Sequence, residues 1–145
     1  MGYEAYIKVN CECYSERILD IISLLKKIKW NIYNYDGLIE YLPIGDIDDF
    51  DWQCSNISEN DLYDIINFKQ NHNEYIGIHL FYNYTEAGIS LIANSTKEVM
   101  MNLNLYRKTN KDNSTDFSWY FQTLILPLRE NGCNINNFTF EEYVD

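Results

Sequence analysis

The fold is decided by residues 75–107, YIGIHLFYNYTEAGISLIANSTKEVMMNLNLYR, in which apolar side chains recur at every second position. The alternating positions are Ile76, Ile78, Leu80, Tyr82 and Tyr84, then Ile89, Leu91 and Ala93, then Val99, Met101, Leu103 and Leu105. A period of two is typical of strands with one buried face. Because the turn-forming segments TEAG and NSTK separate the three runs, the stretch predicts a three-stranded antiparallel meander.

The same alternation opens the chain, where residues 3–13 place apolar side chains on one side and polar side chains on the other. This pattern predicts a half-buried strand whose apolar face includes Cys11 and Cys13. Residues 15–30 then place isoleucine and leucine at helical spacing, with lysines near the end. They predict a helix that begins with Ser15 as its N-cap.

Two further helices are predicted. Residues 58–71 begin with Ser58 and Asp61 in the spacing of a capping box, which indicates a short helix. Residues 116–130 carry aromatic and leucine side chains at helical spacing. A helix is favoured there, although Pro127 would break or kink it, and a strand is the alternative.

The remaining segments complete an α+β pattern. Residues 31–57 have no sustained period and predict an ordered, irregular segment with a short strand at residues 37–42. Residues 136–144 predict a final edge strand. The helices are therefore kept apart from antiparallel strands, which is typical of the α+β class. We expect one globular domain over residues 1–145, a two-layer domain whose antiparallel sheet joins the N-terminal strand to the three-stranded meander, packed by about three helices.

The chain is strongly acidic, with 22 acidic and 11 basic side chains and a formal net charge of −11. Nucleic acids and anionic membrane surfaces are polyanions, so neither is an expected partner, whereas a basic protein is. The opening residues, MGYEAYIKVN, lack the basic and apolar regions of a secretory signal. We therefore expect a cytoplasmic protein whose four cysteines are reduced thiols.

No cofactor and no metal site is predicted. The segment GDIDDFDWQ, residues 45–53, is rich in aspartate, but counting from Asp46 puts the obligatory glutamate of an EF-hand at Ile57. Cys11 and Cys13 form one close pair of thiols, whereas a structural zinc site usually has two such pairs. The six glycines form no phosphate-binding loop.

Catalysis is not predicted either. The two histidines, His72 and His79, lie in no recognisable catalytic motif. His79 is expected on a sheet face, bonded to a neighbour. If the protein is instead a small enzyme of unrecognised family, His79 with Glu98 or Asp116 would be the candidate catalytic residues.

The acidity is concentrated between Trp30 and Phe68, where no lysine or arginine occurs. Aromatic side chains are interleaved with the acids there, and tyrosine and tryptophan are enriched at the centres of protein interfaces. A solvated loop rarely carries so many of them. The predicted partner-binding residues are Asp36, Glu40, Tyr41, Asp46, Asp48, Asp49, Phe50, Asp51 and Trp52.

In size, in acidity and in its abundance of asparagine, isoleucine and tyrosine, the chain resembles the immunity proteins of bacterial toxin systems, including those of contact-dependent growth inhibition. The resemblance spans the whole chain and carries no functional residue across by motif. It implies a partner, a cognate toxin domain that is commonly a basic nuclease, bound one to one with its active-site cleft occluded. The other alternative is a DNA-mimic inhibitor of a DNA-binding protein, whose acids would follow phosphate-like spacing.

Overall fold

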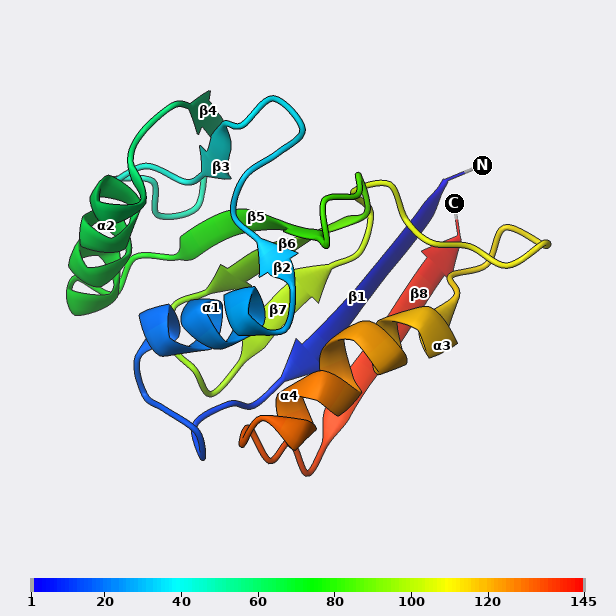
Figure 1. Cartoon of the computed structure of the whole chain (residues 1–145). Helices are drawn as coiled ribbons and strands as arrows, with labels where there is room; N and C mark the ends of the chain where they lie inside the picture. Colours follow the sequence, from blue (N-terminus) through cyan, green and yellow to red (C-terminus); the bar gives the residue numbers. More distant parts are fainter. Residues whose placement is uncertain (1, 145) are drawn as a thin grey trace.

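The computed structural model describes residues 2–144, which form an antiparallel sheet with helices packed against it (Figure 1). The strands are β1 (Tyr3–Val9), β2 (Trp30–Asn31), β3 (Ile39–Tyr41), β4 (Gln53–Ser55), β5 (Ile76–Tyr82), β6 (Gly88–Ala93), β7 (Val99–Asn102) and β8 (Phe138–Val144). The helical elements are α1 (Ile18–Lys27), α2 (Glu59–Asn71), α3 (Phe117–Tyr120), η1 (Phe121–Ile125) and α4 (Leu126–Glu130). The predicted α+β two-layer domain is confirmed.

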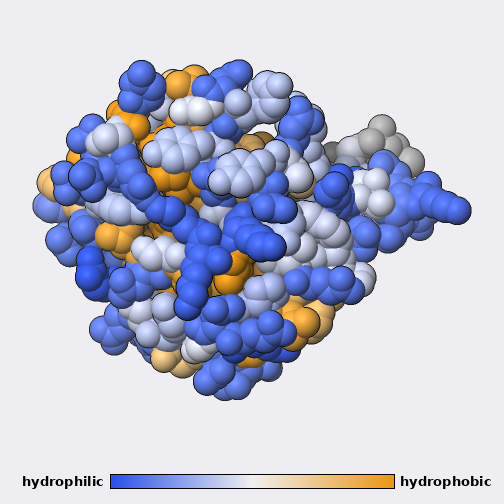
Figure 2. Space-filling view, viewed as in Figure 1, coloured by the Kyte–Doolittle hydropathy of each residue, from blue (hydrophilic) through white to orange (hydrophobic). Residues whose placement is uncertain are grey.

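Within residues 2–144 the strand order is β4-β3-β5-β6-β7-β1-β8, with β2 also pairing with β5. Figure 1 shows α1 and the α3–α4 segment lying across one face of the sheet, with α2 beyond them near β3 and β4. The surface on this side is largely hydrophilic, with small and separate hydrophobic areas (Figure 2). No helix within the described residues is long and apolar enough to cross a membrane.

The meander is confirmed, and its register builds the core. Leu91 lies between Ile78 and Met101 across β5, β6 and β7, and Met101 pairs with Ile7 of β1. All four side chains are fully buried. Because partners in register point to the same face of a sheet, this row of apolar residues lies beneath the helices.

The first strand is shorter than predicted. β1 ends at Val9, and after Cys11 donates its backbone N–H to the Thr96 carbonyl the chain turns away. Cys11 is buried, as its place on the apolar face predicts, but Cys13 is exposed in the turn. The prediction for Cys13 is therefore wrong, because the alternation of the sequence runs on past the end of the strand.

Helix α1 begins at Ile18, and Ser15 is not its N-cap. Ser15 Oγ instead accepts the N–H of Arg17 and donates to Asp20. The first helical N–H, that of Ile18, donates to the side-chain oxygen of Gln70 in α2 at 2.9 Å. A side chain from a distant helix therefore replaces the predicted local cap.

The C-terminal helix and the final edge strand are confirmed. The helix contains a π-type turn, η1, which ends two residues before Pro127, and the helix ends before Gly132, whose φ of 97° suits glycine. Pro127 has no N–H for the carbonyl of Thr123 four residues earlier. That carbonyl accepts the indole N–H of buried Trp30 at 2.9 Å. The proline is thus tolerated because β2 supplies the missing donor.

Helix α2 has the predicted capping box, in which the Asp61 N–H donates to Ser58 Oγ at 3.0 Å and the Asp61 carboxylate accepts the Ser58 N–H. We expect Ser58→Ala to lower the free energy of unfolding by about 1 kcal/mol, because one helical N–H loses its acceptor. Urea unfolding measures this. Ser58→Asp, which keeps an acceptor, is the control and should stay near the wild type. An alanine variant as stable as the wild type would contradict the capping role.

Candidate partner-binding site

The connection between β3 and β4 is shaped by one buried carboxylate. Asp46 is only 7% exposed. Its Oδ1 accepts the backbone N–H groups of Asp49 and Phe50 at 3.1 and 3.0 Å, and its Oδ2 accepts that of Asp51 at 2.7 Å. Asp46 was predicted to pair with a partner's cation. The structure instead places it inside the loop, where its charge is satisfied by three backbone donors.

A buried cation fixes the same loop from the other side. Lys69 of α2 is fully buried, and its Nζ donates to the carbonyls of Pro43 at 2.6 Å and Asp46 at 3.0 Å. It also lies 3.3 Å from Glu74 Oε1, which accepts the N–H of Gly45 at 2.7 Å. Burying an ammonium group is costly unless acceptors surround it, and here they do. The loop is therefore held in one conformation, which lowers the entropy lost on binding.

The side chains that remain outside this framework define the acidic loop surface, which consists of Ile44, Ile47, Asp48, Asp49, Phe50 and Asp51. All six are exposed, and Ile47 is 60% exposed. The three aspartates and Phe50 are predicted site residues that the structure brings together. The two isoleucines were missed, although their place among acids in a segment without strand periodicity could have identified them.

Trp52 lies on the sheet and not on this surface. Its ring packs on that of His79, with centroids 4.0 Å apart and planes at 33°. The close approach depends on Gly77, because a Cβ there would lie 2.9 Å from Trp52 and 2.5 Å from Leu42. Trp52 thus packs within the domain while remaining partly exposed, and its role as an anchor for a partner stays a prediction.

The other predicted residues lie on β3 or beyond it. Glu40 Oε2 accepts a hydrogen bond from Asn34 Nδ2 at 2.7 Å, and Glu40 Oε1 is 2.9 Å from His79 Nδ1. Tyr41 is partly buried and accepts a hydrogen bond from the Ser55 hydroxyl. Asp36 is exposed in the turn before β3. These three residues are therefore separate from the acidic loop surface.

His79 is placed for packing. As predicted it lies on a sheet face and is bonded to a neighbour, but that neighbour is Glu40. Glu98 is instead near Lys8, and Asp116 caps α3. Burial lowers the pKa of His79, and the hydrogen bond and charge of Glu40 oppose this shift. The side chain is thus neutral near pH 7.

The possible chemistry of this region is limited. In the cross-strand register Glu40 lies between Cys54 and His79, so the thiol and the imidazole are not neighbours. Among residues 2–144, no group of three or more His, Cys, Asp or Glu side chains is placed to hold a metal ion.

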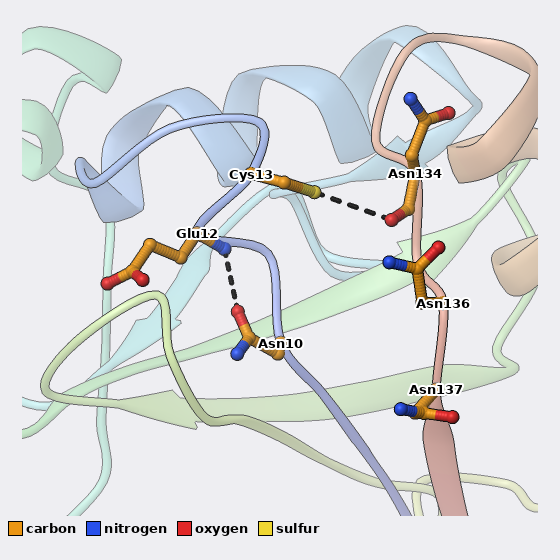
Figure 3. A pocket seen from close by; sticks show the side chains of 6 residues that line it. All are labelled: Asn10, Glu12, Cys13, Asn134, Asn136 and Asn137. Atoms are coloured by element: carbon orange, nitrogen blue, oxygen red, sulfur yellow. Dashed lines mark hydrogen bonds between the residues drawn. The ribbon is translucent and has the colours of Figure 1, made fainter.

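A separate hollow of about 400 Å³ lies between the loop after β1 and the loop before β8 (Figure 3). Its lining is formed by Asn10, Glu12, Cys13, Asn134, Asn136 and Asn137. Cys13 Sγ donates to the Asn134 carbonyl and so joins the two loops, whereas Asn10 Oδ1 accepts the Glu12 N–H within the first loop. The lining contains no cation and no aromatic ring to hold an anionic or stacking ligand.

In comparisons with protein-family models, curated proteins and solved structures, none gives a significant match to this chain. A functional assignment must therefore come from the geometry and charge of the chain itself.

The role of Asp46 can be separated from that of its neighbours. Asp46→Ala leaves three backbone N–H groups without their acceptor, so we expect the free energy of unfolding to fall by about 2 kcal/mol or more. Asp48→Ala, a change of the same kind at an exposed position in the same loop, should alter it by less than about 0.5 kcal/mol. Urea unfolding of both variants provides the measurement. Equal effects would show that Asp46 does not organise the loop.

The lowered pKa of His79 predicts a pH dependence. Below the ordinary value of 6.5 the unfolded chain takes up a proton that the folded protein resists, so stability should fall as the pH drops below about 6.5. In His79→Gln this part of the slope should be lost. Unfolding both proteins by urea at about pH 7.5 and about pH 5.5 measures the difference. An identical slope in the two proteins would exclude His79 as the cause.

Proposed function

We propose that this protein binds and neutralises a cognate toxin domain whose active-site cleft is basic, in the manner of an immunity protein. The observation that supports this most directly is the acidic loop surface. It presents three exposed aspartates and three exposed apolar side chains on a backbone fixed from beneath by Asp46 and Lys69. The loop is thus built before any partner arrives.

Charge supports a basic partner. A nuclease cleft is positive because it holds phosphates, and carboxylates can occupy the same positions by pairing with its arginine and lysine side chains. The net charge of −11 adds long-range attraction, which raises the rate of association with a cation-rich surface. Fast association suits an inhibitor that must intercept its target before the target acts.

The apolar side chains support a protein partner over a bare ion. Ile44, Ile47 and Phe50 are exposed next to the aspartates. Apolar anchors at the centre of a polar rim are typical of interface hot spots. A DNA mimic would instead carry its acids at phosphate-like intervals along a face, whereas three of these acids lie within residues 48–51.

Binding kinetics test the proposal. The triple variant Asp48→Asn, Asp49→Asn, Asp51→Asn should bind the toxin more slowly, with a weaker dependence on salt, because electrostatic steering acts on association. The double variant Ile47→Ala, Phe50→Ala should dissociate faster and lose on the order of 2 kcal/mol of binding free energy. Surface plasmon resonance on the toxin domain that co-purifies one to one with this protein measures both rates.

The matched control neutralises three exposed glutamates elsewhere, as Glu4→Gln, Glu98→Gln and Glu130→Gln, which changes the net charge equally. If this control slows association as much as the aspartate triple variant does, net charge and not the loop is responsible. Unchanged affinity in a folded aspartate triple variant would refute the proposal. Failure of the protein encoded by the neighbouring gene to co-purify with this protein would refute it as well.

A further inference from the structure

Three neighbouring hollows, of about 260, 230 and 170 Å³, share lining residues, and we describe them together as one groove. The first two share Asn31 and Tyr84, and the last two share Asn34 and Tyr35. The loop between β2 and β3 and the turn between β5 and β6 supply most of the lining residues. We call this groove, which runs from Lys29 to Tyr106, the tyrosine groove.

Exposed tyrosines line the groove. Tyr35 is 92% exposed, Tyr84 90% and Tyr106 68%, and they come from three different connections, those between β2 and β3, β5 and β6, and β7 and α3. Side chains so exposed contribute little to the packing of the domain. Their aromatic surface is therefore available to a ligand lying in the groove.

Two of these tyrosines also occupy backbone conformations that disfavour them. Tyr84 has φ 63° and follows Asn83 at φ 48° in a tight turn closed by the bond from Thr85 N–H to the Tyr82 carbonyl. Glycine is the preferred residue at the position of Tyr84 in such a turn. Tyr106, in a separate loop, has φ 48°. Glycine would suit the backbone at either position, so the backbone conformation does not account for the aromatic rings.

The charge at the Tyr106 end of the groove selects its occupant, because Lys26 and Lys29 line only the opposite end. Asp36 and Glu86 are exposed along it, and neither forms an ion pair within residues 2–144. Glu40, the third acid of the lining, is committed to His79. Exposed aromatic faces beside free carboxylates attract guanidinium groups, which stack on rings and pair with carboxylates together.

We propose that the tyrosine groove binds an extended, arginine-bearing segment of a partner polypeptide. The tyrosine rings stack on guanidinium groups, Asp36 and Glu86 pair with them, and the tyrosine hydroxyls are free to bond the backbone of the segment. The site goes beyond the proposed toxin inhibition and does not depend on it. The acidic loop surface follows β3, whereas the loop that carries Tyr35 and Asp36 precedes it. The two surfaces can therefore be mutated separately.

The probe is a short fluorescein-labelled peptide of alternating glycine and arginine, and its fluorescence anisotropy reports binding at physiological salt. We expect the wild type to bind it, and to bind the same peptide with citrulline in place of arginine at least about tenfold more weakly. Tyr84→Gly should weaken binding of the arginine peptide by about tenfold without lowering the midpoint of thermal unfolding, since the turn favours glycine. Tyr35→Ala should weaken binding similarly.

Two controls separate the groove from other surfaces. Tyr14→Ala removes an exposed tyrosine that does not line the groove, and the aspartate triple variant of the acidic loop surface removes charge elsewhere. Both should keep the affinity for the arginine peptide within about twofold. Tyr14 does not line the groove, and about 0.15 M salt screens the effect of charges beyond about 8 Å.

Several results would overturn the proposal. They are no binding of the arginine peptide by the wild type, equal binding of the citrulline peptide, or an equal loss of affinity in Tyr14→Ala. Tighter binding of single-stranded oligothymidylate would overturn it in favour of base stacking on the tyrosines. No toxin is present in this experiment, so its failure would not affect the proposal that the acidic loop surface binds a toxin. Failure of the toxin experiment would likewise not affect the proposal that the groove binds an arginine-bearing segment.

Discussion

The requirement that a buried ammonium group be surrounded by acceptors shapes the half of the molecule that presents the acidic loop. The Lys69 ammonium group donates hydrogen bonds to the carbonyls of Pro43 and Asp46 in the β3–β4 loop and to the carboxylate of Glu74, just before β5. Helix, loop and sheet are thereby held at one point. Asp46 meets the opposite requirement, a buried anion surrounded by backbone N–H groups. Because the loop backbone is hydrogen-bonded to these buried groups, the remaining side chains of the loop face the solvent.

Much of the fold could be predicted because its signals are local. The two-residue alternation of residues 75–107 specified the meander, and the spacing of Ser58 and Asp61 specified the start of α2. What could not be predicted depends on contacts between distant segments. β2 and β4 have two and three residues, too few for any period to appear. The true cap of α1 comes from Gln70, and a local pattern cannot contain it.

Composition indicated the candidate segment, but it could not distinguish the surroundings that the fold gives to each of its residues. The sequence alone does not distinguish the four loop aspartates, and only the folded backbone shows that Asp46 is buried and the other three are exposed. Trp52 was predicted to face a partner. In the structure it packs on His79, and this contact depends on the missing side chain at Gly77. The sequence does not show that contact, because it forms only when β4 and β5 come near each other in the folded sheet. Glu40 became the partner of His79 through strand register, a property of pairing and not of spacing.

The position of β1 has a consequence for the order in which the protein assembles on the ribosome. β1 is the first strand to be made, yet it pairs with β7 and β8, whose residues are the ninety-ninth and later of the chain. The contact between Trp30 and the Thr123 carbonyl is equally late. By contrast, α2, β3, β4 and β5 have their partners within residues 39–82, apart from the contacts of α2 with α1 and of β5 with β2 and β6. During synthesis the nascent chain therefore keeps an apolar strand unpaired long after its acidic loop has left the exit tunnel, and chaperones have a defined segment to protect.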